Sequence, residues 1–385
     1  MATMNKKILI IGGTGTMGRP LVDQLSNDSS NVLWIVSRHN GKDTANKHIL
    51  VGNAFDTVFL KECVLCRRYD AIVDFLWYDE NRFSKSMPLM LRATDQYILL
   101  SSAAVYVESD DIIDENTPRD WDLASEKERI ESRDYNFVKA RLENMLRESG
   151  KNNWTIIRPH LTFNSNRIPL CSWEMNIWLQ RVLNGLTVAI PMDLMSYKTT
   201  LTHGSEIAHQ ICKIIGCEKA LGETFQLGSE KIYTWKEIVD DISGILKEKG
   251  YQLIIYPTDS HTIEKNCPWN ANSLIHNRMR NLCFSTEKYH SLTSDTTAFE
   301  PVEKYLKDSL EIAIEKFKGR KWGRKDVDVI YEHDKIVGGV TPYSCFTTGG
   351  AMLYFLLKIG VPMHIVKNTI HPKQTLKKVI TFFSH

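Results

Sequence analysis

Ile8-Leu-Ile-Ile-Gly-Gly-Thr-Gly-Thr-Met-Gly18 is the stretch that decides the fold, because a short apolar run leads directly into glycines at positions 12, 15 and 18. The apolar run predicts a buried strand, and the glycine spacing predicts a tight turn into a helix that binds a dinucleotide. Gly12 permits the turn, Gly15 lets the backbone approach a pyrophosphate, and Gly18 lets the helix pack close to the sheet. The first N–H groups of such a helix point at the anion. Glycine also suits an ordinary strand-turn-helix, so the loop alone leaves a purely structural role open.

Apolar runs alternate with segments of helical spacing through the first half of the chain. This alternation predicts an α/β fold, a Rossmann-like doubly wound parallel sheet with helices on both faces. The predicted strands are Lys7–Ile11, Val32–Ser37, Ile49–Gly52, Ala71–Leu76, Tyr97–Ser101 and Trp154–Arg158, and the predicted helices include Pro20–Leu25 and Tyr135–Ser149.

The alternation weakens after Pro159, which indicates a smaller C-terminal lobe that binds substrate. Later predicted helices are Trp173–Leu183, Ser205–Ile215, Thr234–Lys249 with Thr234 as its N-cap, and Pro301–Phe317, and later strands are Glu223–Leu227 and Tyr251–Tyr256. We therefore expect a dinucleotide-binding domain in residues 1–160 with parts of 200–230, and a lobe formed mostly by residues 161–320. Residues 326–385 form an extension to which the sequence assigns no role.

The charge and composition of the chain limit the classes of partner that it is expected to bind. The 385 residues include 48 basic and 46 acidic ones, for a formal net charge of +2. No overall field attracts nucleic acid or an anionic membrane, so we expect neither as a partner. The apolar stretch Ala351–Ile359 is far shorter than the ~20 residues of a transmembrane helix. With a polar start, no apolar leader and 8 scattered cysteines, the sequence predicts a cytoplasmic protein with reduced thiols.

Cys63 and Cys66 form a CxxC pair inside the segment Leu60–Arg68, which has helical spacing. Neither a second CxxC nor a nearby pair of histidines accompanies it. We therefore interpret the pair as a chance occurrence on a helix and expect no metal site.

Tyr135 and Lys139 form a Tyr-x-x-x-Lys pair, which a helix places on one face with Cβ atoms about 5–6 Å apart. A nearby ammonium favours the phenolate, so the hydroxyl becomes usable as a proton donor or acceptor. Such pairs also occur on ordinary exposed helix faces. Upstream, the strand Tyr97–Ser101 ends at Ser102, where a parallel sheet presents its ligand-binding edge. Ser102 would hydrogen-bond the reacting oxygen, although a serine there can also simply cap a turn.

These motifs together resemble the extended short-chain dehydrogenase/reductases, in particular the NAD-dependent epimerase/dehydratase group. The motifs are the glycine loop, Ser101-Ser-Ala-Ala-Val-Tyr106, the Tyr135/Lys139 pair and Ile157-Arg-Pro159, and the resemblance covers roughly residues 5 to 320. Within the group, the chain looks closer to the atypical branch related to chloroplast stem-loop-binding proteins.

The resemblance implies roles for individual residues. It makes Tyr135 the catalytic acid/base, Lys139 the residue that orients the nicotinamide ribose, and Ser102 the residue that polarises the substrate oxygen. It also implies a homodimer. The cofactor-binding set comprises Gly12, Thr14, Gly15, Thr16, Met17, Gly18, Arg19, Ser37, Arg38, Asn53, Leu76 and Pro159. In place of the family's small residues near the cofactor ribose, Leu76 stands among the bulky residues that follow the fourth strand.

The end of the second strand distinguishes NADP from NAD, because an acidic residue there binds the ribose hydroxyls and a basic one accommodates a 2′-phosphate. This chain has Ser37-Arg38-His39 at that point. Arg38 offers a planar, permanently charged fork, and Arg19 could reach the same phosphate from the helix start. The sequence therefore favours NADP, with NAD possible. Two merely solvated arginines are the alternative interpretation.

The leading hypothesis for function is an NAD(P)-dependent oxidoreductase or epimerase that acts on a nucleotide-linked sugar through hydride transfer. Candidate groups for the substrate diphosphate are Arg158, Arg167, Arg181, Lys198 and His203.

Two other hypotheses remain open from the sequence. One is an NADPH-dependent reductase of a small carbonyl metabolite, whose apolar pocket would be lined by Trp173, Trp178, Phe163 and Met175. The other is a non-catalytic, cofactor-sensing or RNA-associated protein, for which the basic cluster Arg320–Lys325 is the suitable feature. The presence of Ser102, Tyr135 and Lys139 together favours an enzyme.

Overall fold

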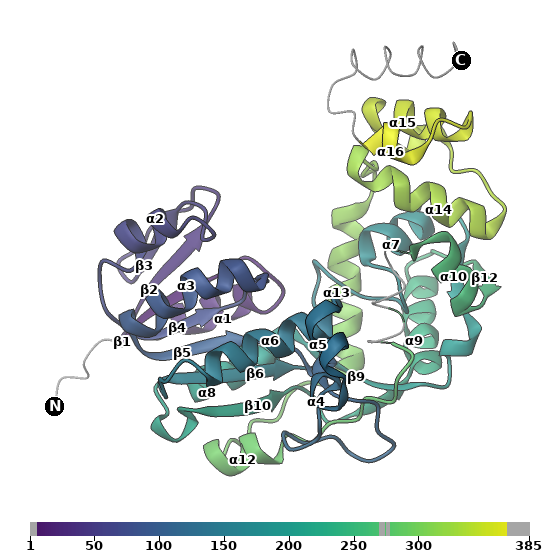
Figure 1. Ribbon diagram of the computed structural model, residues 1–385. Coiled ribbons are helices and arrows are strands. Elements are labelled where there is room, and N and C mark those ends of the chain that lie inside the picture. Colours follow the sequence, from purple (N-terminus) through teal and green to yellow (C-terminus); the bar gives the residue numbers. More distant parts are fainter. Residues whose placement is uncertain (1–5, 269–273, 275–277, 368–385) are drawn as a thin grey trace. The chain divides into compact units, whose positions relative to one another are not determined.

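The computed structural model describes residues 6–268, 274 and 278–367. It divides into two compact units (Figure 1). Unit 1 comprises residues 1–164, 197–234 and 279–306, and unit 2 comprises residues 165–196, 235–278 and 307–385.

A seven-stranded sheet with the order β3-β2-β1-β4-β5-β6-β10 forms the centre of unit 1. Its neighbouring strands all pair in parallel. The strands are β1 (Lys6–Ile11), β2 (Asn31–Ser37), β3 (Lys47–Val51), β4 (Tyr69–Asp74), β5 (Thr94–Leu100), β6 (Trp154–Pro159) and β10 (Glu223–Leu227). The predicted Rossmann-like doubly wound sheet is confirmed, and β1 and β4 lie at the point where the strand order reverses direction.

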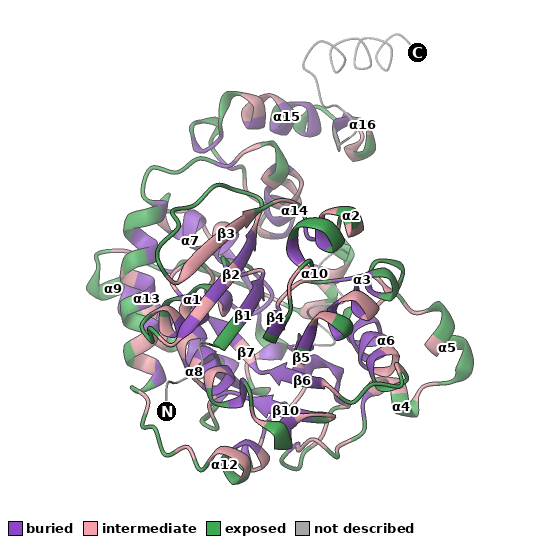
Figure 2. Ribbon diagram, turned by 90° about the vertical axis from the view of Figure 1, so that its left-hand side faces the viewer, coloured by how far each residue is buried: buried purple, intermediate pink, exposed green. Residues whose placement is uncertain are grey.

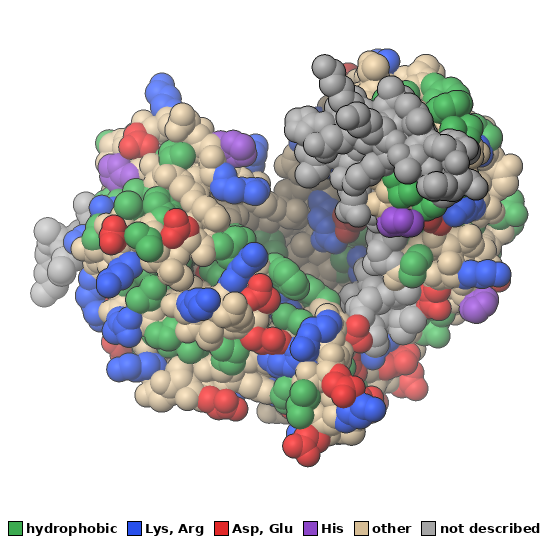
Figure 3. Space-filling view, turned by 45° about the horizontal axis from the view of Figure 1, so that its top comes forward, with side chains coloured by type: hydrophobic (Ala, Val, Ile, Leu, Met, Phe, Trp, Pro, Cys, Tyr) green, Lys and Arg blue, Asp and Glu red, His purple; other side chains and the backbone are tan. Residues whose placement is uncertain are grey.

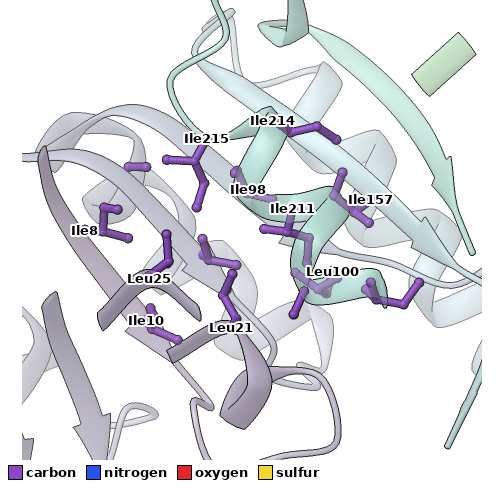
Figure 4. Packing of buried hydrophobic residues seen from close by; sticks show 14 of the residues in the cluster. Ile8, Ile10, Leu21, Leu25, Ile98, Leu100, Ile157, Ile211, Ile214 and Ile215 are labelled. Carbon is purple, nitrogen blue, oxygen red and sulfur yellow. The ribbon is translucent and has the colours of Figure 1, made fainter. Parts of the chain in front are cut away.

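The inner strands of this sheet are mostly buried, which explains their apolar runs, whereas the edge strand β3 is only partly buried (Figure 2). Side chains alternate between the faces, so Ile8 and Ile10 belong to one core and Leu9 and Ile11 to the other. Helices α1 (Gly18–Ser26) and α8 (Gly204–Ile214) cover the first face, as the close view of that core shows (Figure 4). Helices α3 (Glu80–Ala93) and α6 (Tyr135–Arg147) cover the second.

Shorter elements complete unit 1. A three-stranded sheet contains β7 (Leu161–Phe163), β9 (Lys198–His203) and β11 (Ile232–Thr234), and the remaining helices are α2 (Thr57–Phe59), α4 (Asp120–Leu123), α5 (Glu126–Glu131) and α12 (Glu287–Thr293).

Unit 2 is mainly helical, with a two-stranded parallel sheet. Its elements are α7 (Met175–Leu183), β8 (Val188–Pro191), α9 (Trp235–Glu248), β12 (Ile255–Thr258), α10 (Ser260–Asn266), α14 (Val327–Val337), α15 (Thr348–Lys358), α16 (Met363–Lys367) and most of α13 (Val302–Phe317). The side chain of Arg181 on α7 donates to the Asp334 carboxylate on α14 at 2.9 Å. This buried ion pair fixes α14 to α7.

Several predicted element ends differ from the structure. The predicted helix Leu60–Arg68 is a turn of π-helix that ends at Val64. Thr234 is the last residue of β11, and helix α9 begins at the next residue, as a helix with Thr234 at the N-cap position would. The predicted strand Tyr251–Tyr256 is replaced by β12, because the N–H of Tyr251 is used to close the end of α9 at the Leu246 carbonyl.

No helix in the described part of the chain is long and apolar enough to cross a membrane. The same residues contain no group of three His, Cys, Asp or Glu side chains arranged to hold a metal ion. Cys63 and Cys66 are both exposed free thiols.

Candidate active site

The glycine-rich loop has the geometry that its spacing predicts. Gly12 adopts φ of 85°, in the left-handed region that favours glycine. A Cβ on Gly18 would clash with the Gly12 carbonyl and lie 2.8 Å from Cα of Gly13, so only glycine permits this close packing. Helix α1 then begins at Gly18, and its N-cap Met17 makes no capping side-chain hydrogen bond. The first turn also contains no acidic residue, so its N–H groups suit an anion.

Other loop residues are placed beside this turn. Thr14, Gly15 and Arg19 are exposed, and the N–H of Gly15 donates to the Gly12 carbonyl at 3.2 Å. The carbonyl of Thr16 accepts a hydrogen bond from the Asn164 amide at 3.0 Å, which ties the loop to the segment after β7.

The ends of β2 and β3 carry the predicted adenosine-side residues. Ser37 is the last residue of β2, and its hydroxyl accepts the His39 N–H at 3.1 Å. Arg38 is exposed and forms no ion pair within the described residues. Asn53 follows β3, is exposed, and uses its carbonyl oxygen to accept the Phe55 N–H at 3.1 Å. Its amide N–H groups therefore remain available to a ligand.

The end of β4 closes against the glycine turn. A Cβ on Gly12 would touch Phe75 at 3.0 Å and Leu76 at 3.7 Å, so Leu76 lies beside the turn. The N–H of Leu76 donates to the Asp74 carboxylate at 3.0 Å. Asp74 is completely buried. Burial raises the pKa of its carboxyl, and hydrogen bonds from Leu76, Tyr78 and Tyr97 oppose this only in part.

The structure brings the three predicted catalytic residues to the end of β5. Lys139 is buried, and its Nζ donates to the Leu100 carbonyl at 2.7 Å. The same Nζ lies 5.9 Å from the ring centroid of Tyr135. Ser102 follows two residues after Leu100, and its Oγ accepts the Ala104 N–H at 3.2 Å, which leaves its proton free to donate. The Tyr135 side chain is 37% exposed and thus open to a ligand.

Glu143 fastens the helix that carries Tyr135 and Lys139. It lies one turn beyond Lys139, has no exposed surface, and accepts the Ser101 hydroxyl at 2.5 Å. Three arginines also donate to its carboxylate: Arg158 at 2.6 Å, Arg119 at 3.0 Å and Arg147 at 3.3 Å. Burial acts to raise the pKa of Glu143, but the arginine charges outweigh it and lower the pKa to about 2.

Sequence reasoning missed the roles of Asp74 and Glu143. The spacing of Tyr135, Lys139 and Glu143 at i, i+4 and i+8 is the signal that could have found the latter, since it places all three on one helix face. For Asp74, Leu76 and Tyr78 are close in sequence, but no regular spacing marks them as its partners, and Tyr97 comes from the neighbouring strand β5. Pro159, the last residue of β6, is buried beside Leu227 in the sheet register.

Two expectations about the substrate-binding groups are wrong. Arg158 is 2% exposed and Arg181 is also 2% exposed, and each is consumed by a buried carboxylate, Glu143 and Asp334 respectively. Neither guanidinium is available to a substrate diphosphate. A buried cation needs a partner of opposite charge, and Glu143 and Asp334 supply it here.

The expectation that four apolar side chains line a substrate pocket is also wrong. Its four side chains, Trp173, Trp178, Phe163 and Met175, are all at most 2% exposed and belong to the core. The two indole N–H groups donate to backbone carbonyls of Ala189 and Ile168. Of the other candidate groups, Arg167 is paired with Glu174, and His203 stacks on Tyr305 with ring centroids 4.4 Å apart.

Comparison with solved structures shows the same fold in nucleotide-sugar enzymes. A dTDP-glucose 4,6-dehydratase from Bacillus anthracis in complex with NAD matches with a TM-score of 0.61 and 14% identity over 80% of this chain and 97% of that one. UDP-glucose 4-epimerase from Bifidobacterium longum, in complex with NAD+ and UDP, matches with a TM-score of 0.59 and 14% identity, over 81% of this chain and 99% of that one. The epimerase Mth375 from Methanothermobacter thermautotrophicus matches with a TM-score of 0.62 and 16% identity, over 82% of this chain and 95% of that one.

A curated relative is the chloroplast stem-loop binding protein of 41 kDa b from Arabidopsis thaliana, 26% identical over 252 residues. The match spans 61% of this chain and 61% of that protein. No protein-family model matches the chain. The chain thus has the fold of the extended short-chain dehydrogenase/reductases, as the sequence motifs indicated.

Proposed function

We propose that this protein is a nicotinamide-dinucleotide-dependent oxidoreductase or epimerase that acts on a nucleotide-linked sugar. The observation that carries the proposal is the position of Lys139, whose Nζ contacts the last carbonyl of β5, two residues before Ser102, and lies 5.9 Å from the Tyr135 ring. The fold shared with a dTDP-glucose dehydratase and a UDP-glucose epimerase supports this class of substrate.

The residues at the glycine turn fit a dinucleotide. The left-handed Gly12, the closely packed Gly18 and the uncapped start of α1 form a cradle for a pyrophosphate. Bound there, the cofactor would supply the hydride acceptor or donor at its nicotinamide ring. We propose a preference for NADP, because Arg38 and Arg19 are exposed, unpaired in the described residues, and able to bind a 2′-phosphate.

The catalytic roles follow from what each side chain can still do. The Tyr135 hydroxyl makes no hydrogen bond within the described residues, so it can exchange a proton with a substrate hydroxyl or carbonyl. Ser102 retains its donor for the same oxygen. Lys139, whose Nζ lies 5.9 Å from the Tyr135 ring, can bind a ribose hydroxyl of the dinucleotide beside the phenol.

Replacing Tyr135 with Phe tests this proposal. We expect turnover to fall about 10²–10⁴-fold, the range of a lost general acid or base, while dinucleotide affinity stays within about threefold because the ring remains in place. Turnover is measured with UDP-glucose, UDP-glucuronic acid and dTDP-glucose, and with small ketones to test the carbonyl-reductase alternative. Tyr256→Phe, which removes the hydroxyl of an exposed tyrosine in unit 2, is the matched control. Turnover of Tyr135→Phe equal to that of Tyr256→Phe would remove Tyr135 from the mechanism.

Binding of a nucleic-acid stem-loop is a second candidate function, favoured by the name of the Arabidopsis relative. Figure 3 shows lysine and arginine side chains interspersed with acidic and hydrophobic ones on the face that it draws. Such a mixed surface favours the small-molecule function. A labelled RNA hairpin, titrated against the same purified protein at two salt concentrations, separates the candidates. Saturable, salt-dependent RNA binding without any sugar-nucleotide turnover would favour the second.

A further inference from the structure

Asp74 is a buried carboxylate that the proposed reaction does not itself use. The hydroxyls of Tyr78 and Tyr97 donate to its Oδ2 at 2.8 and 2.9 Å, and the Leu76 N–H donates to its Oδ1 at 3.0 Å. All three partners act as donors in this arrangement, so both carboxylate oxygens are occupied as acceptors. Each phenol hydroxyl can also accept a hydrogen bond, so the two tyrosines can hold the Asp74 carboxyl in either protonation state.

Lys139 is the cation that lies near this carboxylate. In the sheet register Asp74 is paired with Leu99, and the Lys139 Nζ is bound to the carbonyl of the next residue, Leu100. The positive charge of Lys139 lowers the pKa of the Asp74 carboxyl, against the effect of burial. Among the described residues, no carboxylate oxygen lies within 4.0 Å of this Nζ, so Asp74 and Lys139 form no direct ion pair.

A buried ammonium needs an opposite charge nearby, because one neutral carbonyl does not replace its lost hydration. The groups that face Lys139 from its own helix are the Tyr135 phenol and, one turn further on, Glu143. Glu143 is already surrounded by three arginines. This leaves Asp74, on the neighbouring strand, as the charge that balances Lys139.

We propose that Asp74 is a positioning residue that, held by Tyr78 and Tyr97, keeps the Lys139 ammonium at the end of β5, where it is set to meet a dinucleotide ribose and the Tyr135 phenol. The ribose contact rests on the proposed function, whereas the pairing of the two charges stands on the contacts of this chain alone.

The proposal makes dinucleotide binding sensitive to the protonation of Asp74. The groups that face this carboxylate are Tyr78 beyond β4, Tyr97 on β5 and Lys139 on α6. When pH falls through the raised pKa of Asp74, the negative charge disappears and Lys139 loses its electrostatic anchor. Affinity for the dinucleotide then falls on the acid side, and a variant without the carboxylate lacks this fall.

Asp74→Asn tests the positioning role, with Tyr69→Phe as the control. Tyr69 is a buried tyrosine on the same strand whose hydroxyl donates to the Val64 carbonyl and does not contact Asp74. The full-length protein is titrated with NADP and with NAD+ by calorimetry over a range of pH. We expect Asp74→Asn to bind the dinucleotide about tenfold more weakly at neutral pH, the effect of an interaction worth one pKa unit. We also expect the affinity of this variant not to fall as the pH is lowered. Asp74→Glu should restore part of both.

Folded Asp74→Asn that binds like the wild type with the same pH profile would overturn the proposal. Because that variant can fail to fold, a second measurement follows the 13Cγ resonance of Asp74 in ligand-free wild type and Lys139→Met. Loss of the ammonium should raise the pKa of the Asp74 carboxyl, and an unchanged titration overturns the pairing. A wild type that binds no dinucleotide contradicts the proposed function instead, and the carbon titration still decides whether the two charges are coupled.

Discussion

Asp74 and Glu143 are both carboxylates with no exposed surface, on the face of the sheet that α3 and α6 cover, yet their surroundings differ in kind. Asp74 is held by two tyrosine hydroxyls and one backbone N–H, and burial raises the pKa of its carboxyl. Glu143 is held by three arginines and a serine, and its pKa is lowered to about 2 despite burial. Two equally buried carboxyls therefore have pKa values shifted in opposite directions, because the donors around Glu143 are positively charged and those around Asp74 are neutral.

The difference matters because the two carboxylates flank Lys139. Glu143 fixes α6 to Ser101, directly before Ser102. Asp74 acts on the ammonium itself. The contacts of Glu143 therefore hold helix α6 in place, whereas the charge of Asp74 acts on the single side chain of Lys139.

Glu143→Gln should have the largest effect on this comparison. It leaves Arg119, Arg147 and Arg158 buried or partly buried without their shared anion, and breaking a buried ion pair in this way costs about 3–5 kcal/mol. We expect the free energy of unfolding, measured in urea, to fall by that amount. Glu148→Gln removes an exposed carboxylate from the end of the same helix and should change it by less than about 0.5 kcal/mol. Equal losses in both variants would show that the arginine cluster contributes nothing special.

The pH dependence of stability should have opposite signs at the two sites. The pKa of Glu143 is lowered from 4.5 to about 2, so its contribution is present above pH 4.5 and is lost as pH falls towards 2; by linkage it amounts to about 3 kcal/mol. The pKa of Asp74 is raised from 3.8, so its contribution is present below pH 3.8 and is lost as pH rises through the raised value. The free energy of unfolding is measured as a function of pH for the wild type, Glu143→Gln and Asp74→Asn. The difference between the wild type and each variant gives the contribution of that carboxyl. The result that would contradict this is a wild-type advantage over both variants that changes in the same direction with pH.

The sequence was a good guide where local pattern controls structure. The glycine turn, the six strands of the first half and the Tyr135/Lys139 helix follow from apolar runs, from glycine's access to positive φ and from the 3.6-residue period, all of which are local. The charged residues were less predictable. Arg158 looks like a ligand for a diphosphate in the sequence and is instead a partner of Glu143, because only the packing of α6 on β6 brings the two together. The contact of Asp74 with Tyr97 is likewise set by the pairing of β4 with β5, which a linear pattern does not display.

Tyr97→Phe should have the smallest effect and separates the hydrogen bonds of Asp74 from its charge. It removes one donor from Oδ2 and leaves the carboxylate, Tyr78 and Lys139 in place. A hydrogen bond to a charged group contributes about 1.5–3 kcal/mol, and the fully buried ring fills the same space, so we expect a loss near the lower end of that range. Because the Tyr97 hydroxyl lowers the pKa of the Asp74 carboxyl, its removal should also raise that pKa, which 13C titration measures. A stability loss without any change in the Asp74 titration would mean that the hydroxyl acts through packing alone, and the setting of Lys139 would then depend on Tyr78 and on the charge of Asp74.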